Sequence, residues 1–137
     1  MEFVVNEKWP IDKAIRFSML EKQAEVMLQD KRFGKFDIVS LANNHINDSL
    51  YGGIKSTRNY LDKKKILHVG ANESEDDMDN IPILDKKGIK VAFLAYTFST
   101  NGIPLNSEYL FGTNLIRFNA LNPEDYDPSL IHKHIKK

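Results

Sequence analysis

The stretch over residues 36–48 constrains the fold more than any other part of the chain. It begins with a short apolar run, interrupted by Asp37 and Ser40, that predicts a buried β-strand. The run leads directly into Asn43-Asn44-His45, and Asp48 follows three residues later. Helix-forming residues come after the glycine pair at 52–53. Strand, polar turn and helix in this order are typical of open α/β sheets, which bind ligands at the carboxyl ends of parallel strands. We therefore take the turn as the candidate site.

The rest of the chain continues the α/β pattern. Apolar residues at three- and four-residue spacing predict an amphipathic helix over 11–30. Its expected inward face is Phe17, Leu20, Ala24, Met27 and Leu28. We also expect a helix over 53–64 with Ile54 and Leu61 on its inward face, and a helix over 128–137. A strand is expected over 66–69 and an extended segment over 109–118. Residues 81–84 and 89–96 flank a glycine-containing turn and predict a hairpin, and the apolar second arm is typical of a strand buried on both faces. The acidic run over 73–79 is expected to be a solvated loop or helix start.

Three polar loops leave the carboxyl ends of three expected strands. They cover residues 43–48, 70–72 and 97–101. If the three strands are parallel neighbours, the loops meet at one rim of the sheet. This convergence is the second reason to place a site at the first loop.

Composition limits the classes of function. The chain has 137 residues, which suits one domain (1–137) with a hydrophobic core of its own. Nineteen basic residues balance nineteen acidic ones, so no excess of positive charge favours nucleic acid as a partner. The absence of cysteine excludes disulfides, thiolate catalysis and cysteine-ligated zinc. No segment has the roughly 18 consecutive apolar residues of a membrane span, and residues 1–10 lack the features of a signal peptide.

The residue types of the turn allow two interpretations. Asn44 offers a carbonyl oxygen and His45 an imidazole, and both groups serve divalent transition metals when other ligands complete the shell. A histidine in such a place could also protonate a leaving oxygen. Alternatively, Asn43, Asn44 and Asp48 only form turn and cap hydrogen bonds, and His45 is satisfied locally. His68 lies within an expected strand, where a packed histidine is the commoner case.

The order of several motifs resembles one bacterial family. These motifs are Phe-Asp-Ile-Val-Ser-Leu-Ala-Asn-Asn-His over 36–45 with Asp48, Leu-His-Val-Gly-Ala over 67–71, Gly-Ile-Lys-Val-Ala-Phe-Leu-Ala-Tyr-Thr over 88–97, and Thr-Asn-Gly-Ile-Pro over 100–104. Together they are similar to the capsule-synthesis family of CapA type, also associated with poly-γ-glutamate synthesis. The resemblance covers roughly residues 11–137, nearly the whole chain.

The resemblance implies a fold and a chemistry. The family is similar to the calcineurin-like metallophosphoesterases, so we expect part of a layered α/β sandwich with a mixed sheet and flanking helices. By resemblance, Asn44 would ligate a divalent metal such as manganese, zinc or iron, and His45 would be a general acid or transition-state donor. Asp48 would belong to the same catalytic group as His45 and would orient the turn or the histidine. His68, Thr97 and Asn101 would line the substrate rim.

The chain also departs from the family pattern. Before Trp9 it has no strand with the usual Gly-Asp metal motif, and it has no counterpart of the family's later histidine motifs. We therefore expect an internal piece of a longer metal-dependent hydrolase that acts on an anionic or glycan cell-surface polymer, outside the cytoplasm, and we expect the piece alone to be inactive. The alternative is a non-catalytic binding or assembly subunit of a polymer synthesis and export complex. Sheet edges left unpaired would favour self-association.

Overall fold

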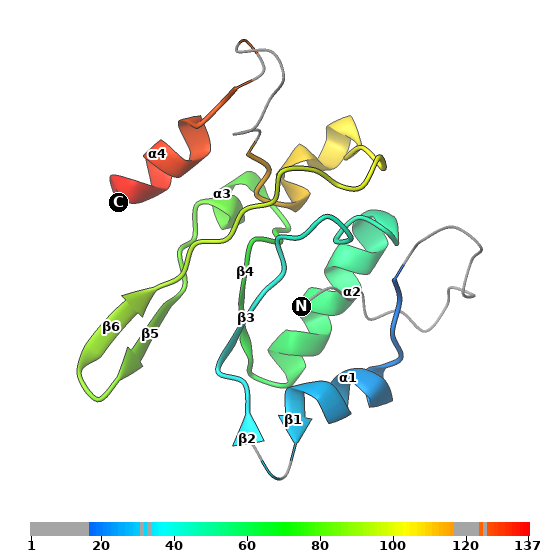
Figure 1. Ribbon diagram of the computed structural model, residues 1–137, viewed down its shortest axis with the longest axis vertical. Coiled ribbons are helices and arrows are strands. Elements are labelled where there is room, and N and C mark those ends of the chain that lie inside the picture. Colours follow the sequence, from blue (N-terminus) through cyan, green and yellow to red (C-terminus); the bar gives the residue numbers. More distant parts are fainter. Residues whose placement is uncertain (1–16, 31, 33, 117–123, 125) are drawn as a thin grey trace.

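The centre of the fold is a parallel pair of strands, β3 (Ile38–Ser40) and β4 (Leu67–Val69), connected by helix α2 (Leu50–Lys63). It is seen in a computed structural model that describes residues 17–30, 32, 34–116, 124 and 126–137. Figure 1 shows α2 lying alongside the two strands. The predicted order of strand, polar turn, helix and strand is confirmed, and the fold class is α/β as predicted.

The other elements surround this unit. In chain order they are α1 (Glu21–Leu28), the short antiparallel pair β1 (Gln29–Asp30) and β2 (Gly34–Lys35), α3 (Glu75–Met78), the hairpin β5 (Ile83–Lys86) and β6 (Ile89–Ala92), a 3₁₀ segment (Ser107–Gly112) and α4 (Ser129–Ile135). Ser74 begins α3 by accepting a hydrogen bond from the Asp77 backbone N–H, so the acidic run is a helix start, as expected. No helix in the described part of the chain has both the length and the apolar character needed to cross a bilayer.

The hydrophobic core lies between α1, α2 and β3. Its buried side chains are Ala24, Leu28, Val39, Leu41, Ile46, Ile54, Tyr60, Leu61, Ile66 and Ala71. Ile54 and Leu61 are the two residues of the second helix that the spacing placed inward, and both are fully buried. The core therefore holds the candidate turn against α2, because Leu41 precedes the turn and Ile46 lies within it.

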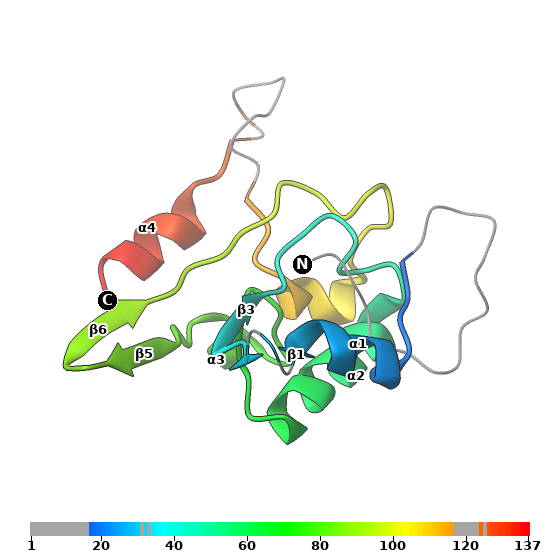
Figure 2. The same cartoon turned by 60° about the horizontal axis from the view of Figure 1, so that its bottom comes forward.

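The hairpin projects away from the β3–β4 pair (Figures 1 and 2). Lys87 and Gly88 form its two-residue turn with φ of 56° and 83°, the positive values that such tight turns require. The prediction that the second arm is buried on both faces is wrong, since every residue of β6 is exposed and Ile89 is 67% exposed. The reason is that no other described strand pairs with the hairpin. Self-association stays a prediction.

Two element boundaries also differ from the prediction. Within the described residues the first helix begins only at Glu21, and residues 11–16 lie outside them. The preceding Leu20 is extended, with ψ of 149°, and the Phe17 backbone N–H donates to Asp48. This tertiary bond holds the residues before the helix in a non-helical path, so Phe17 and Leu20 are exposed instead of buried. Met27, within the helix, is also exposed. The expected extended segment begins with the 3₁₀ turn and becomes extended only from Thr113.

Position 70, directly after β4, requires a glycine because of both its backbone angle and its close neighbours. Its φ is +89°, and a Cβ there would lie 2.6 Å from the Ala42 Cβ. Gly88 has a similar φ of +83° but nothing within 4 Å of the same position. We expect Gly88→Ala to lower the free energy of unfolding by about 1–2 kcal/mol through the backbone angle alone. Gly70→Ala should cost about 1–3 kcal/mol more, because the neighbours must shift. Urea denaturation of both variants tests this, and equal losses would contradict it.

Candidate functional site

The turn after β3 is built by its first asparagine. The Asn43 side-chain oxygen accepts a hydrogen bond from the His45 backbone N–H at 2.8 Å, and its amide nitrogen donates to the Leu41 carbonyl at 3.0 Å. These two bonds reverse the chain within three residues, as asparagine commonly does in turns. Asn43 therefore has the structural role that the sequence allowed for it, and it fixes where the next two side chains lie.

His45 and Asp48 form a buried pair. The His45 Nδ1 lies 2.9 Å from the Asp48 Oδ2, and the two residues are 7% and 1% exposed. A carboxylate can only accept, so Nδ1 carries the proton and, in the neutral ring, Nε2 carries the lone pair. The Phe17 ring packs edge-on against the imidazole with centroids 4.4 Å apart, and the Phe17 N–H donates to the same Asp48 oxygen at 2.6 Å. The pair is thus oriented by one carboxylate and shielded by one aromatic ring.

Asn44 differs from its neighbours. Its side chain is half-buried, and it makes no hydrogen bond to any residue that the structure describes. Its carbonyl oxygen is therefore available as a ligand. A metal ion needs several such ligands, and the described residues contain no group of three or more histidine, cysteine or acidic side chains that could hold one. The described residues thus do not by themselves supply a complete set of metal ligands.

A second asparagine connects the turn to a distant loop. Asn47 is fully buried, and its amide donates to the carbonyls of Ile103 at 2.9 Å and Pro104 at 3.2 Å. Residues 103–104, just past the predicted 97–101 loop, therefore lie against the turn. Within that loop the Thr97 hydroxyl donates to the Ser99 carbonyl, and Asn101 is exposed with φ of 53°. Neither side chain forms a hydrogen bond with His45 or Asn44.

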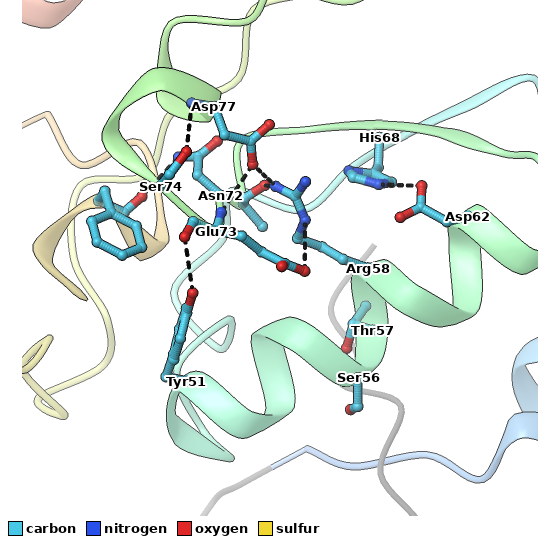
Figure 3. A network of polar contacts seen from close by, with 12 residues as sticks. Tyr51, Ser56, Thr57, Arg58, Asp62, His68, Asn72, Glu73, Ser74 and Asp77 are labelled. Carbon is cyan, nitrogen blue, oxygen red and sulfur yellow. Dashed lines mark hydrogen bonds and ion pairs between the residues drawn. The ribbon is translucent and has the colours of Figure 1, made fainter. Parts of the chain in front are cut away.

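His68, the third residue expected at the rim, lies elsewhere. Its Nε2 pairs with Asp62 at the end of α2 at 3.1 Å, and it lines a cavity to which neither Asn44 nor His45 contributes. Figure 3 shows this ring close to the Asp62 and Arg58 side chains. Of the predicted site residues, the structure therefore brings Asn44, His45 and Asp48 together and places His68 apart from them.

Burial of two histidines predicts how stability depends on pH. Desolvation lowers the pKa of His68, and the nearby Arg58 lowers it further; desolvation also lowers the pKa of His134. Below about pH 6.5 the unfolded chain therefore binds protons that the folded chain does not. The free energy of unfolding thus decreases as the pH is lowered through this range. His68→Gln should make this fall shallower, because one of the two buried rings no longer contributes. Urea denaturation between pH 7.5 and about 5 measures the slopes, and identical slopes for the variant and the unchanged protein would contradict the assignment.

A buried polar network beside β4 was not predicted from the sequence. The Asn72 amide donates to the Phe111 carbonyl and to Asn114, at 2.8 and 2.9 Å. The Asn114 amide donates to the Ala95 carbonyl at 3.1 Å, and the Thr113 hydroxyl donates to the Gly70 carbonyl at 2.6 Å. These bonds hold the carboxyl end of β4 to the 95–97 and 111–116 segments. The only local signal was that polar residues follow Gly70-Ala71 and Gly112.

Comparison with known proteins gives two matches. The family described as bacterial capsule synthesis protein PGA_cap matches residues 1–137. The chain is also similar to the capsule biosynthesis protein CapA of Bacillus anthracis, with 34% identity over 94 residues. That alignment covers 69% of this chain and 23% of the relative, so the chain corresponds to under a quarter of the relative's length. No solved structure matches significantly.

Proposed function

Because the chain belongs to the bacterial capsule synthesis protein PGA_cap family, we propose that it acts on a capsule polymer at the bacterial cell surface, as the part of a hydrolase that carries its proton-transfer histidine. The observation that supports this most is the His45–Asp48 pair, with Nδ1 bound to a buried carboxylate at 2.9 Å. A base whose ring is fixed by a third group is the usual arrangement of general acid–base catalysis.

The chemistry of the pair follows from its tautomer. Asp48 holds the Nδ1 proton, so Nε2 is the nitrogen that takes a proton from an attacking water or returns one to the leaving group. Phe17 covers the imidazole, which reduces the water around it and strengthens its interaction with the carboxylate. Asp48 is a positioning residue in this scheme, because its contacts are with His45 and the Phe17 N–H.

Asn44 is the residue of the turn that we propose as a ligand of a divalent metal. Manganese, zinc or iron would supply a Lewis acid that polarises the bond to be cleaved. The Asn44 carbonyl oxygen is the group in the turn that would contact it, and the described residues supply no complete set of ligands. The remaining ligands would have to come from outside the described residues, and the described part alone is expected to be inactive.

The substrate in this proposal is an anionic or glycan polymer outside the cytoplasm. His68, Thr97 and Asn101 stay candidates for contacts with it, of which Asn101 is the most accessible. A non-catalytic role, as a binding or assembly subunit of the polymer synthesis and export complex, is the competing outcome. It predicts that His45 can be replaced without loss of capsule.

Deletion of the gene in its own bacterium tests the proposed role. We expect the amount or the chain length of the capsule polymer to change, because members of this family act in capsule synthesis. Restoring the intact gene should restore the polymer. Both quantities are measured by size-exclusion chromatography of polymer released from equal numbers of cells. A deletion strain with an unchanged capsule would contradict the proposal.

A further inference from the structure

A cavity of about 360 Å³ runs along β4 and is separate from the His45 turn. We call it the β4-edge cavity. Residues from α2, β4, α3 and α4 surround it, together with the 80–82 and 93–94 segments. Its volume falls in the range of small-molecule sites, about 300–1,000 Å³. His68 also lines it. The residues on either side of His68 use their backbone groups to pair with the β3 side: the Leu67 N–H donates to the Asp37 carbonyl, and the Val69 carbonyl accepts from the Leu41 N–H. The backbone N–H and C=O of His68 therefore point away from β3.

Two buried nitrogen atoms beside this cavity have only a distant carboxylate as a partner. The His134 Nε2 lies 3.8 Å from the Asp79 Oδ1, and the Arg58 Nε lies 3.6 Å from the Glu73 Oε1, both beyond hydrogen-bond length. His134 is 4% exposed, and its other ring nitrogen is held by the Tyr96 hydroxyl at 2.7 Å, which fixes the ring. Arg58 is held in place by Asp77 and by the Ala71 carbonyl, as Figure 3 shows for the Asp77 carboxylate. Neither long contact fully satisfies its buried nitrogen, so a ligand oxygen at hydrogen-bond distance would add a favourable interaction.

The charge of the lining indicates what the ligand carries. The cations Arg58 and Lys65 are balanced by the carboxylates Asp62 and Asp77. Burial lowers the pKa of both His68 and His134, so these rings are neutral at neutral pH. A charged ligand would therefore lose its hydration in a cavity that has no surplus of the opposite charge, and this loss costs free energy. An uncharged ligand with several hydroxyl groups would not bear this cost.

The remaining wall is apolar. It includes Ile66, Val69, Ile81, Pro82, Phe93 and Leu94. One side of the cavity thus offers polar partners and the other offers an aliphatic and aromatic surface. A sugar ring has the matching arrangement, since its hydroxyls both donate and accept while its C–H face packs on apolar or aromatic side chains.

We propose that the β4-edge cavity binds a single uncharged sugar unit. The hydroxyls would bond to the His134 and His68 rings and to the open backbone groups of His68, and the ring face would pack on Phe93 and Pro82. This site is distinct from the His45 turn and does not depend on whether His45 transfers protons. It would let the protein hold a glycan while a different part of the chain acts on it.

The test is titration of the intact, isotope-labelled protein with glucose and N-acetylglucosamine, with L-glutamate as the anionic comparison. Histidine ring signals are followed by NMR. We expect saturable shifts of the His68 and His134 signals with at least one sugar, and none of His45 or His132. Asn80→Trp, at an exposed position on the rim, should weaken binding by about tenfold or more by occupying the cavity. Asn59→Trp, exposed on α2 and outside the lining, is the matched control and should bind as the unchanged protein does.

Three results would overturn the proposal. The first is no saturable shift with either sugar. The second is tighter binding of L-glutamate at the same two rings, which would assign the cavity to an anion. The third is unchanged sugar binding in Asn80→Trp. A shift of His45 alone would place sugar binding at the turn and would also overturn the assignment to this cavity, while leaving the proposed function standing.

Discussion

Replacing His45 by asparagine is expected to lower the rate of the proposed hydrolysis about 100-fold to 10,000-fold with little loss of stability. The asparagine amide nitrogen lies close to where Nδ1 lies in histidine, so it can still donate to Asp48. The variant has no counterpart of Nε2 that could take up or return a proton. A gene carrying this variant should therefore fail to restore the capsule polymer in the deletion strain.

His132→Asn is the matched control for this experiment. His132 is exposed on α4 and takes no part in the turn, so this variant should restore the polymer fully. Thermal melts of both purified variants establish that each is folded. A His45→Asn protein that is folded and restores the capsule would exclude proton transfer by His45 and support a binding or assembly role.

Replacing Asp48 by alanine is expected to cost about 3–5 kcal/mol of unfolding free energy. Asp48 is 1% exposed, and its Oδ2 accepts hydrogen bonds from both the His45 ring and the Phe17 backbone. Removal leaves two buried donors without an acceptor, and it also releases the residues before α1 from the turn. Urea denaturation measures the loss.

The chain contains a second histidine–carboxylate pair that serves as the control. Asp62 bonds to His68 at 3.1 Å, close to the 2.9 Å of the first pair, but its side chain is 64% exposed. Exposed pairs contribute about 0–1 kcal/mol, so Asp62→Ala should change stability little. Equal losses for Asp48→Ala and Asp62→Ala would show that burial of the first pair is not what makes it important.

Sequence patterns predicted the elements whose signals are local. The apolar run before Asn43, the inward positions Ile54 and Leu61, and the two-residue turn at Lys87-Gly88 all correspond to the structure. At the start of the last helix, the Asp127 carboxylate accepts a hydrogen bond from the Ser129 N–H at 2.9 Å. Each of these features depends on residues a few positions apart, which is the range over which propensity and periodicity act.

The features that were missed depend on contacts between distant residues. The start of α1 is set by the bond from Phe17 to Asp48, 31 residues away, which overrides the helical spacing. The role of Asn47 depends on carbonyls 56 and 57 residues further along the chain. For β6 the apolar run signalled burial, but packing is decided by the presence of a covering element, which the described residues do not provide.

For the candidate site, the local pattern identified the turn but could not assign its members. Asn43, Asn44 and Asn47 are the same residue type within five positions, yet one builds the turn, one makes no bond to a described residue and one holds a distant loop. Only the three-dimensional arrangement separates these roles. It also moves His68 from the expected rim to a separate cavity.

Direct cleavage of the capsule polymer is the most decisive measurement. Polymer isolated from the deletion strain is incubated with manganese, zinc or iron and the wild-type product of the whole gene, because the described part alone is expected to be inactive. The chain length of the polymer is followed by size-exclusion chromatography. We predict that the polymer shortens, that new chain ends appear in proportion, and that His45→Asn removes the effect. Binding of the polymer with no shortening under any of these conditions, or equal shortening by His45→Asn, would contradict the assignment of this turn as a hydrolytic site.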